Sequence, residues 1–451
     1  FLRLTGGGQA CTVTLAPNTL SHTWIMRNET AAALTLTQGS GANVVIAAGQ
    51  TKIVATDGAG SGAVVYEMDD LELAGNLAVG GELSTPSAGT SNTRIGVNAG
   101  NSIASGGNYN VVVGDEAGTA ITTGADNTFY GYSAGAAVTT GTNNTIIGSL
   151  AGDALTVGTR NVAVGKSALS ADTQGSRSVA VGRSALQTQN FTSATNAYNV
   201  AVGDFAGFAV TTGVNNTIVG GLAGDAITTG DYNVALGMTT LSTNTAANKN
   251  VAIGAQALAD FNVTSDTDTY NVAVGYAAGA AHTTGTQNTL IGGLAGDAIT
   301  TASNNTAVGY ASLSTNITGT ANTAVGKDAL LVNTASSNTA VGMDALTANT
   351  TGDTNTAVGK DSMKATTTGT NNSAFGARSL DTNTTGTNNV AVGDQALGAN
   401  TSGNSNTAVG VGALDANTTA DNNVAVGLNS LGANTTGTQN VAVGIQTLLT
   451  N

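Results

Sequence analysis

The sequence predicts an all-β protein: a parallel β-solenoid fibre that follows a small β module at the N-terminus. Three observations predict this fold. The pentad Asn-(Thr/Val)-Ala-Val-Gly, with some imperfect copies, recurs 21 times in the range 92–451, and 16 of the 20 steps between its glycines equal 17, as from Gly148 to Gly165. The pentad residues are small and apolar, and only 9% of the chain is charged. A short fixed period of this kind is typical of stacked coils that contact only their neighbours.

Three segments are expected along the chain. Residues 1–70 form a small all-β module, because short apolar runs alternate with Gly- and Ser-rich turns. Residues 71–91 form a strand pair and a linker, and residues 92–451 form the array of 21 coils with period 17. The strands expected in the first module are Cys11–Leu15, Leu34–Thr37, Val44–Ile46, Lys52–Val54 and Val64–Tyr66.

Each coil is described here by positions counted from the pentad glycine, which is position 0. Position −1 is apolar in all 21 coils, position −2 is apolar in 20 and mostly Ala, and position −3 is Thr, Val or Ser. Neighbours on a strand point to opposite faces, so we expect positions −1 and −3 to face the coil interior. Position −2 would then face a partner chain, since a strand that is apolar on both faces is buried on both. The predicted trimer-core residues are Ala163, Ala201, Ala273, Ala357, Ala391 and Ala442.

The turn after the pentad also follows a rule. Position +3 is always Ala, Ser or Thr, which indicates a tightly packed site. In eight coils position +4 is Gly and +7 is a larger side chain such as Ile299; in the other 13 coils +4 is Leu or Met and +7 is usually Asn. We interpret this exchange as one interior slot that is filled from either side of the turn. The recurring Asn at −4 and +7 predicts ladders of stacked amides.

Composition argues against several classes of partner. The formal net charge is −14, whereas nucleic-acid binding and electrostatic membrane attachment both need a surplus of Lys and Arg. No apolar run is long enough to span a bilayer, so we expect no membrane insertion. Cys11 is the only cysteine, so no intrachain disulfide and no thiolate metal cluster are expected.

Catalytic, cofactor and metal sites are not expected. The two histidines, His22 and His282, lie far apart in the sequence, and His282 occupies the apolar +7 slot. The carboxylates mostly follow the pentad glycine, where a solvated outer turn is predicted. The segment Leu-Ala-Gly-Asp-Ala recurs at equal intervals, at Leu150, Leu222 and Leu294, which indicates duplication of a larger block rather than a metal site.

Aromatic side chains gather around two irregular coils. The steps from Gly182 to Gly203 and from Gly254 to Gly275 are longer than the regular step by four, and 13 of the 14 Phe and Tyr residues of the array lie between Tyr109 and Tyr310. Exposed aromatics on loops can stack on sugar rings, which makes these insertions candidate ligand-binding sites. The alternative interpretation is that the rings plug a widened turn. The candidate residues are Phe191, Tyr198, Phe261 and Tyr270.

The repeat resembles two families. Segments 178–185 (SVAVGRSA) and 271–278 (NVAVGYAA) resemble the head repeat of trimeric autotransporter adhesins, and the longer form in 406–418 (NTAVGVGALDANT) is similar to repeats of phage tail fibres. The adhesin resemblance implies that the solenoid is a homotrimeric, left-handed parallel β-roll with three chains per head. The fibre resemblance implies a structural protein of the virion that mediates or presents attachment to a host-surface glycan or protein.

Three functions are therefore open. A phage tail fibre is favoured, and a bacterial trimeric surface adhesin or another extracellular filament is the alternative. An ice-binding solenoid is the third, because rows of Thr can order water. It is disfavoured because Thr at position −3 alternates with Val and is expected to face inward.

Overall fold

The computed structural model describes residues 2–67 and 88–449, in two compact units, Phe1–Leu83 and Ser84–Asn451. The strand pair expected between Asp69 and Ser84 lies outside the described residues.

The first unit is the small β module. Its two sheets have the strand orders β1-β3-β6-β7 and β2-β4-β5, and Met26, Leu36, Ile46 and Val54 are buried in its core. All five expected strands are confirmed with small differences at their ends, but β1 and β3 were not predicted. The elements are β1 (Leu2–Leu4), β2 (Cys11–Thr14), β3 (Thr23–Asn28), β4 (Leu34–Thr37), β5 (Val44–Ile46), β6 (Thr51–Thr56), a 3-10 helix (Gly60–Gly62) and β7 (Val65–Glu67).

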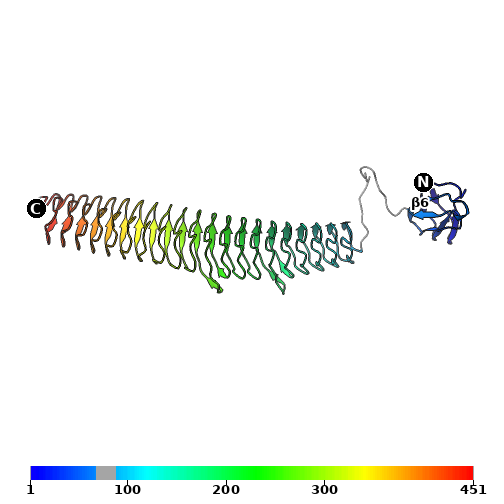
Figure 1. Ribbon diagram of the computed structural model, residues 1–451, viewed down its shortest axis with the longest axis horizontal. Helices are drawn as coiled ribbons and strands as arrows, with labels where there is room; N and C mark the ends of the chain where they lie inside the picture. Colours follow the sequence, from blue (N-terminus) through cyan, green and yellow to red (C-terminus); the bar gives the residue numbers. More distant parts are fainter. Residues whose placement is uncertain (1, 68–87, 450–451) are drawn as a thin grey trace. The chain divides into compact units, whose positions relative to one another are not determined.

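The second unit is a stack of coils that forms an elongated column (Figure 1). Each coil contributes one short strand at positions −3 to −1, and each strand pairs in parallel with the next. The strands of this sheet are β8 (Thr93–Ile95), β9 (Val111–Val113), β10 (Thr128–Tyr130), β11 (Thr145–Ile147), β12 (Val162–Val164), β14 (Val179–Val181), β16 (Val200–Val202), β17 (Thr217–Val219), β18 (Val234–Leu236), β20 (Val251–Ile253), β22 (Val272–Val274), β23 (Thr289–Ile291), β24 (Thr306–Val308), β25 (Thr323–Val325), β26 (Thr339–Val341), β27 (Thr356–Val358), β28 (Ser373–Phe375), β29 (Val390–Val392), β30 (Thr407–Val409), β31 (Val424–Val426) and β32 (Val441–Val443).

The register of this sheet follows the repeat of the sequence. Val162 lies opposite Val179, which is its equivalent in the next coil, and Val179 lies opposite Val200 across the first of the two long steps. The additional residues of each long step leave the ladder intact because they leave the coil as an insertion. The predicted parallel solenoid, with one sequence repeat per coil, is confirmed.

The pentad glycine is required by the stacking of backbone on backbone. Gly220 has φ +136°, and a Cβ at this position would lie 2.4 Å from the carbonyl oxygen of Gly237 in the next coil. Gly221, the next residue, has open space around the position of a Cβ. The pentad therefore ends in glycine because a side chain there would separate two coils.

We expect Gly220→Ala to lower the free energy of unfolding by about 2–4 kcal/mol, through backbone strain and loss of coil contact. Gly221→Ala is the matched control and should change it by less than about 0.5 kcal/mol. Urea unfolding followed by circular dichroism measures both. Equal effects of the two substitutions would contradict the steric explanation.

The predicted assignment of strand faces is wrong. Position −2 points into the interior of its own coil, whereas positions −1 and −3 point outward: in β27, Ala357 is fully buried and the flanking Thr356 and Val358 are partly exposed. The alanines predicted to meet a partner chain are already covered within one chain. Ala163, Ala201, Ala273, Ala357 and Ala391 are fully buried and Ala442 is 3% exposed.

The physical reason is the narrow interior of the coil. Leu or Met at +4, or a larger side chain at +7, already fills it, together with the small residue at +3. Little volume remains opposite the strand, so most coils admit only Ala at −2. Where −2 is large, as at Phe129, position +4 is Gly135, and a Cβ there would lie 2.7 Å from the Phe129 ring. In the coils that admit only Ala at −2, the larger β-branched residues of the strand therefore lie on the outer face.

The exchange between +4 and +7 is confirmed as an interior packing rule. Leu313 and Asn316 occupy these positions in one coil and are both fully buried. In the preceding coil the same positions hold Gly296 and Ile299, and Ile299 is also fully buried. A buried Asn is accommodated because it pairs with the backbone: the Asn316 Nδ2 donates to the Gly319 carbonyl, and the Gly319 N–H donates to Asn316 Oδ1.

We expect Leu313→Gly to destabilise the array by about 2–5 kcal/mol, because it opens a cavity. Adding Asn316→Ile should recover part of this loss, since the double variant reproduces the Gly and Ile arrangement of the preceding coil. Thermal unfolding of the single and double variants tests the rule. A double variant that is no more stable than Leu313→Gly would contradict it.

The amide ladders expected at −4 and +7 are both present. At −4, Asn127 links three coils: its N–H and Nδ2 donate to Asn110 Oδ1, and its Nδ2 also donates to the Gly141 carbonyl. At +7, the Asn400 Nδ2 donates to Asn383 Oδ1 at 2.9 Å. These buried amides form hydrogen bonds with backbone N–H and C=O groups of the turns, which would otherwise have no partner.

Candidate binding surfaces of the array

The outer face of the long sheet is an apolar stripe. Position −1 is Val, Ile, Leu, Tyr or Phe in every coil, and position −3 is Val in ten coils, Thr in ten and Ser in one. These side chains are partly or fully exposed, for example Val392, which is 37% exposed, and Ile291, which is 39% exposed. The outward direction of the −3 threonines removes one of the two reasons against water ordering, the expected inward face, whereas the alternation of Thr with Val remains.

The two insertions project from one side of the column as short two-stranded ribbons (Figure 1, green). In the first ribbon β13 (Gly175–Ser176) pairs with β15 (Thr195–Asn196); in the second, β19 (Ala247–Asn248) pairs with β21 (Thr267–Asp268). Both ribbons lie on the turn that leads into the long sheet, because their strands end at position −6 or −7. The insertions therefore place their polar side chains beside position −5.

The four predicted aromatic residues divide into two kinds. Phe191 and Phe261 are 6% and 0% exposed, so the alternative interpretation, that these rings plug the widened turn, holds for both. Tyr198 and Tyr270 occupy position −5 and are 49% and 50% exposed. Only the tyrosines therefore offer a ring to a ligand.

A cation accompanies each of these tyrosines. The Arg177 guanidinium carbon lies 5.5 Å from the centre of the Tyr198 ring, and the Arg177 Nε donates to Asn196 Oδ1. The Lys249 Nζ lies 5.3 Å from the centre of the Tyr270 ring. The two insertions thus share one arrangement: a cation from one coil and a tyrosine from the next.

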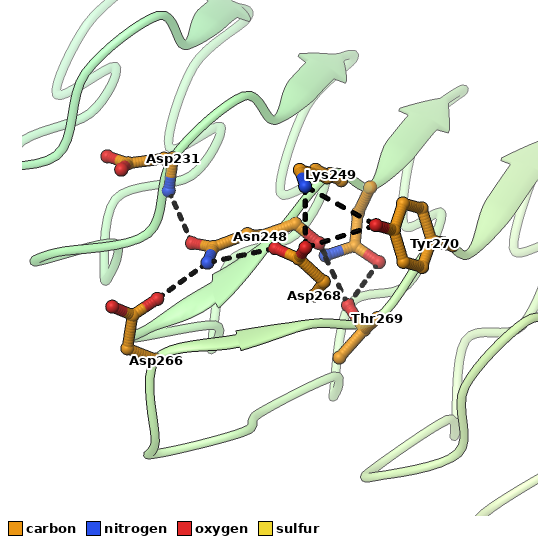
Figure 2. Close-up of polar contacts among 8 residues, drawn as sticks. Asp231, Asn248, Lys249, Asp266, Asp268, Thr269 and Tyr270 are labelled. Carbon is orange, nitrogen blue, oxygen red and sulfur yellow. Dashed lines mark hydrogen bonds and ion pairs between the residues drawn. The ribbon is translucent and has the colours of Figure 1, made fainter.

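The second ribbon is acidic. Figure 2 shows Lys249, Asp268 and the Tyr270 hydroxyl pointing toward one another: Lys249 Nζ lies 2.5 Å from Asp268 Oδ2, and the Tyr270 hydroxyl donates to the same oxygen. The Asn248 Nδ2 donates to Asp266 Oδ1, and its Oδ1 accepts the backbone N–H of Asp231. Hydrogen bonding to Lys249 lowers the pKa of Asp268, so this carboxylate stays charged and neutralises the lysine.

The first ribbon covers a buried polar network instead. Ser178 replaces the Asn of the −4 ladder, and Gln189 takes over its role: the Gln189 Nε2 donates to Asp172 and to Ser178, and its Oε1 accepts from Asn199. Burial raises the pKa of Asp172, although its carboxylate also accepts the backbone N–H groups of Gly175 and Phe191. The network is structural, since all its members are buried.

His282 lies in the core beside the second insertion. Its ring stacks on Phe261 with 5.2 Å between ring centres, and its Nε2 is 2.9 Å from the Gly285 carbonyl. Its Nδ1 is buried and has no hydrogen-bond partner in the described part of the chain. Burial lowers the pKa of His282 to about 4, so the ring is neutral near pH 7. A packed histidine in the +7 slot, as expected from the sequence, is confirmed.

The repeated aspartates of the Leu-Ala-Gly-Asp-Ala segments lie at position +5. Burial raises the pKa of Asp153 and of Asp225, and one carboxylate oxygen of each is buried without a hydrogen-bond partner among the described residues. The third, Asp297, accepts a hydrogen bond from Ser314 in the next coil. Across residues 2–67 and 88–449, no three His, Cys, Asp or Glu side chains gather to hold a metal ion. The same ranges contain no helix able to cross a bilayer.

Sequence reasoning missed two features of these surfaces. One is the outward direction of the apolar stripe. The other is the pairing of Tyr198 and of Tyr270 with a cation at position −5 of the preceding coil, which an alignment of the repeats could have found. Comparison of the chain with protein-family models, with curated proteins and with solved structures gives no match.

Proposed function

We propose that this chain is a structural subunit of an extracellular attachment fibre, of the kind found in phage tails, and that three copies assemble side by side along the apolar stripe. The observation that carries the proposal is the stripe itself, which runs through every coil of the sheet. Soluble monomers rarely expose contiguous apolar surface of more than a few hundred Å². A partner is therefore needed along the whole column.

A second copy of the chain fits this requirement. At about 4.8 Å per coil, 21 coils make a stripe of about 100 Å, and a partner must be equally long and regular to cover it. Another copy presents the same side chains at the same step. The number three comes from the resemblance to trimeric fibre and adhesin repeats, and the host-surface glycan or protein that the fibre would contact comes from the same resemblance.

The expected species in native buffer has three times the 43.8 kDa mass of the chain and appears as a rod in negatively stained images. Native mass spectrometry and electron microscopy measure both. A monomer at micromolar concentration, or a dimer, would overturn the trimeric arrangement. Attachment is tested by incubating the labelled rod with bacterial and animal cells, and a rod that binds neither would overturn the attachment role.

Ice binding is the second candidate, and the outward −3 threonines favour it. These residues share a face with the −1 valines, as Thr356 does with Val358 in β27. The two functions make different demands on the stripe, because ice binding needs it exposed and fibre assembly needs it covered. Thermal hysteresis by a monomer would support ice binding and contradict the fibre.

A further inference from the structure

Position −5 forms a straight row of outward side chains along the array, one per coil. In most coils it holds Asn, Gln, Ser, Thr, Ala or Asp, but Arg, Lys or Tyr occupies it in six of the seven consecutive coils from Arg160 to Tyr270. The first five of these coils share one left-handed backbone conformation at −5, with φ between +51° and +64°. Because the coils stack and the backbone conformation at −5 is the same in each, the five positions follow a line, which measures about 19 Å at ~4.8 Å per coil. The residues are Arg160, Arg177, Tyr198, Asn215 and Tyr232.

We propose that this row, the Arg160–Tyr232 row, binds an extended acidic polysaccharide, with carboxylate or sulfate groups on Arg160 and Arg177 and a sugar ring on Tyr198. The inference rests on the proposed attachment function, for which it names the class of ligand. Its first support is charge. Between positions 154 and 203 the chain has four cations and a single carboxylate, Asp172, which is buried beneath the first insertion.

This concentration of positive charge stands out in a chain of net charge −14. Arg160 and Arg177 occupy the same position in adjacent coils, where two cations repel unless an anion lies between them. Among the described residues, the side chains that contact the Arg177 guanidinium are neutral, Asn196 and the Tyr198 ring. Arg183, at the other end of the strand, is paired with Asp204. The charge of the Arg160–Tyr232 row is therefore available to a ligand.

The second support is the aromatic surface. Tyr198 is 49% and Tyr232 is 55% exposed, with Asn215 in the coil between them. Aromatic faces on a polar surface stack on flat rings, and Asn supplies both a hydrogen-bond donor and an acceptor for hydroxyl groups. A linear ligand that runs along the column would meet the arginines first and Tyr198 next, and its acidic groups would stop short of Tyr232, where the Asp231 carboxylate accepts the Val214 N–H.

The second insertion provides an internal comparison. It has the same cation and tyrosine, but Asp268 is paired with Lys249, and Asp266 accepts a hydrogen bond from Asn248 in the same ribbon (Figure 2). An acidic polysaccharide would be repelled there. The proposal therefore assigns the ligand to the first insertion alone, although both have an exposed tyrosine.

Biolayer interferometry at an ionic strength of about 0.15 M, where distant charges are screened, tests the proposal. It measures binding of the full chain to polygalacturonate, dextran sulfate, neutral dextran and inorganic polyphosphate. We expect both acidic polysaccharides to bind and dextran not to bind. The charge-assisted contacts should make Arg160→Gln with Arg177→Gln weaken this binding by roughly 30-fold or more. Tyr198→Ala should weaken it by roughly 10-fold, as for rings stacked on aromatic side chains, but should change polyphosphate binding by less than about 2-fold.

Two matched controls accompany these variants. Lys166→Gln removes one charge from the same coil as Arg160 but at position +1, and Tyr270→Ala removes the equivalent ring at the second insertion; each should change affinity by less than about 3-fold, because exposed charges act weakly at a distance. Unchanged thermal unfolding of all the variants shows that the fold is intact.

Several results would overturn the proposal. One is binding of dextran as tight as that of polygalacturonate. The others are no loss of affinity in the double arginine variant, and an equal loss for polyphosphate and polysaccharide in Tyr198→Ala. Native mass spectrometry distinguishes a failure of the polysaccharide proposal from a failure of the proposed fibre. A trimeric rod without polysaccharide affinity removes only this inference, and a monomer that binds through the Arg160–Tyr232 row removes only the fibre.

Discussion

Ala391→Glu should prevent the array from folding, whereas Val392→Glu, one residue later in β29, should leave the single chain folded and abolish assembly. Ala391 is fully buried within its own coil, and an unpaired carboxylate there should cost roughly 4 kcal/mol or more. Val392 is 37% exposed on the apolar stripe, so its replacement should change the stability of one chain by less than about 1 kcal/mol. In an assembled fibre the same glutamate would be buried between copies.

Circular dichroism and native mass separate these effects. The expected results are an unfolded or severely destabilised Ala391→Glu chain and a folded, monomeric Val392→Glu chain. Asp394→Ala, which changes a partly exposed carboxylate in the same coil, is the control and should do neither. If the Ala391→Glu chain folds but does not assemble, position −2 faces a partner chain, as the sequence had predicted.

Acid should destabilise the array through His282. The folded pKa is about 4 and the ordinary value is 6.5, so the folded chain favours the neutral ring. The stabilising contribution is complete above pH 6.5 and is lost as the pH falls from 6.5 to 4. A shift of this size corresponds to about 3 kcal/mol, since each pKa unit is worth about 1.4 kcal/mol.

His282→Val is the matched variant, because the equivalent +7 positions in the two earlier copies of the duplicated block hold Val210 and Val138. We expect the free energy of unfolding to fall by about 3 kcal/mol more in the wild-type chain than in the variant between pH 7 and pH 4. The difference between the two chains isolates the histidine from the buried aspartates, whose raised pKa values act in the opposite direction. Parallel pH profiles would show that His282 is not the sensitive group.

The direction of the strand faces could have been predicted from the repeats. A large residue at −2, such as Phe129 or Ile146, occurs only in coils with Gly at +4. This covariation indicates that the two positions share one interior volume, and it therefore places −2 inside. Hydrophobicity alone misled the prediction, because Val at −1 and Ala at −2 are both apolar and only their size distinguishes the crowded interior from the outer face.

The sequence by itself determined the period, the register and the buried slots of the array. Each of these depends on contacts that repeat every coil, so the same residue type recurs at the same position: Gly at 0, Asn at −4, and Leu or Ile at +4 or +7. In the first module, β3 escaped prediction because it buries Asn28, which donates to the Ile46 and Ala32 carbonyls and interrupts the apolar alternation.

Only the tertiary structure decided what the insertions present to solvent, and it overturned the strand faces that the alternation of apolar residues had predicted. A strand alternates its side chains whichever face is inward, so the choice depends on the volume that the rest of the coil leaves free. Likewise, the sequence places Phe191 and Tyr198 in one insertion, but the path of the backbone buries the phenylalanine and exposes the tyrosine beside Arg177. Such outcomes depend on contacts between coils, which a local pattern does not contain.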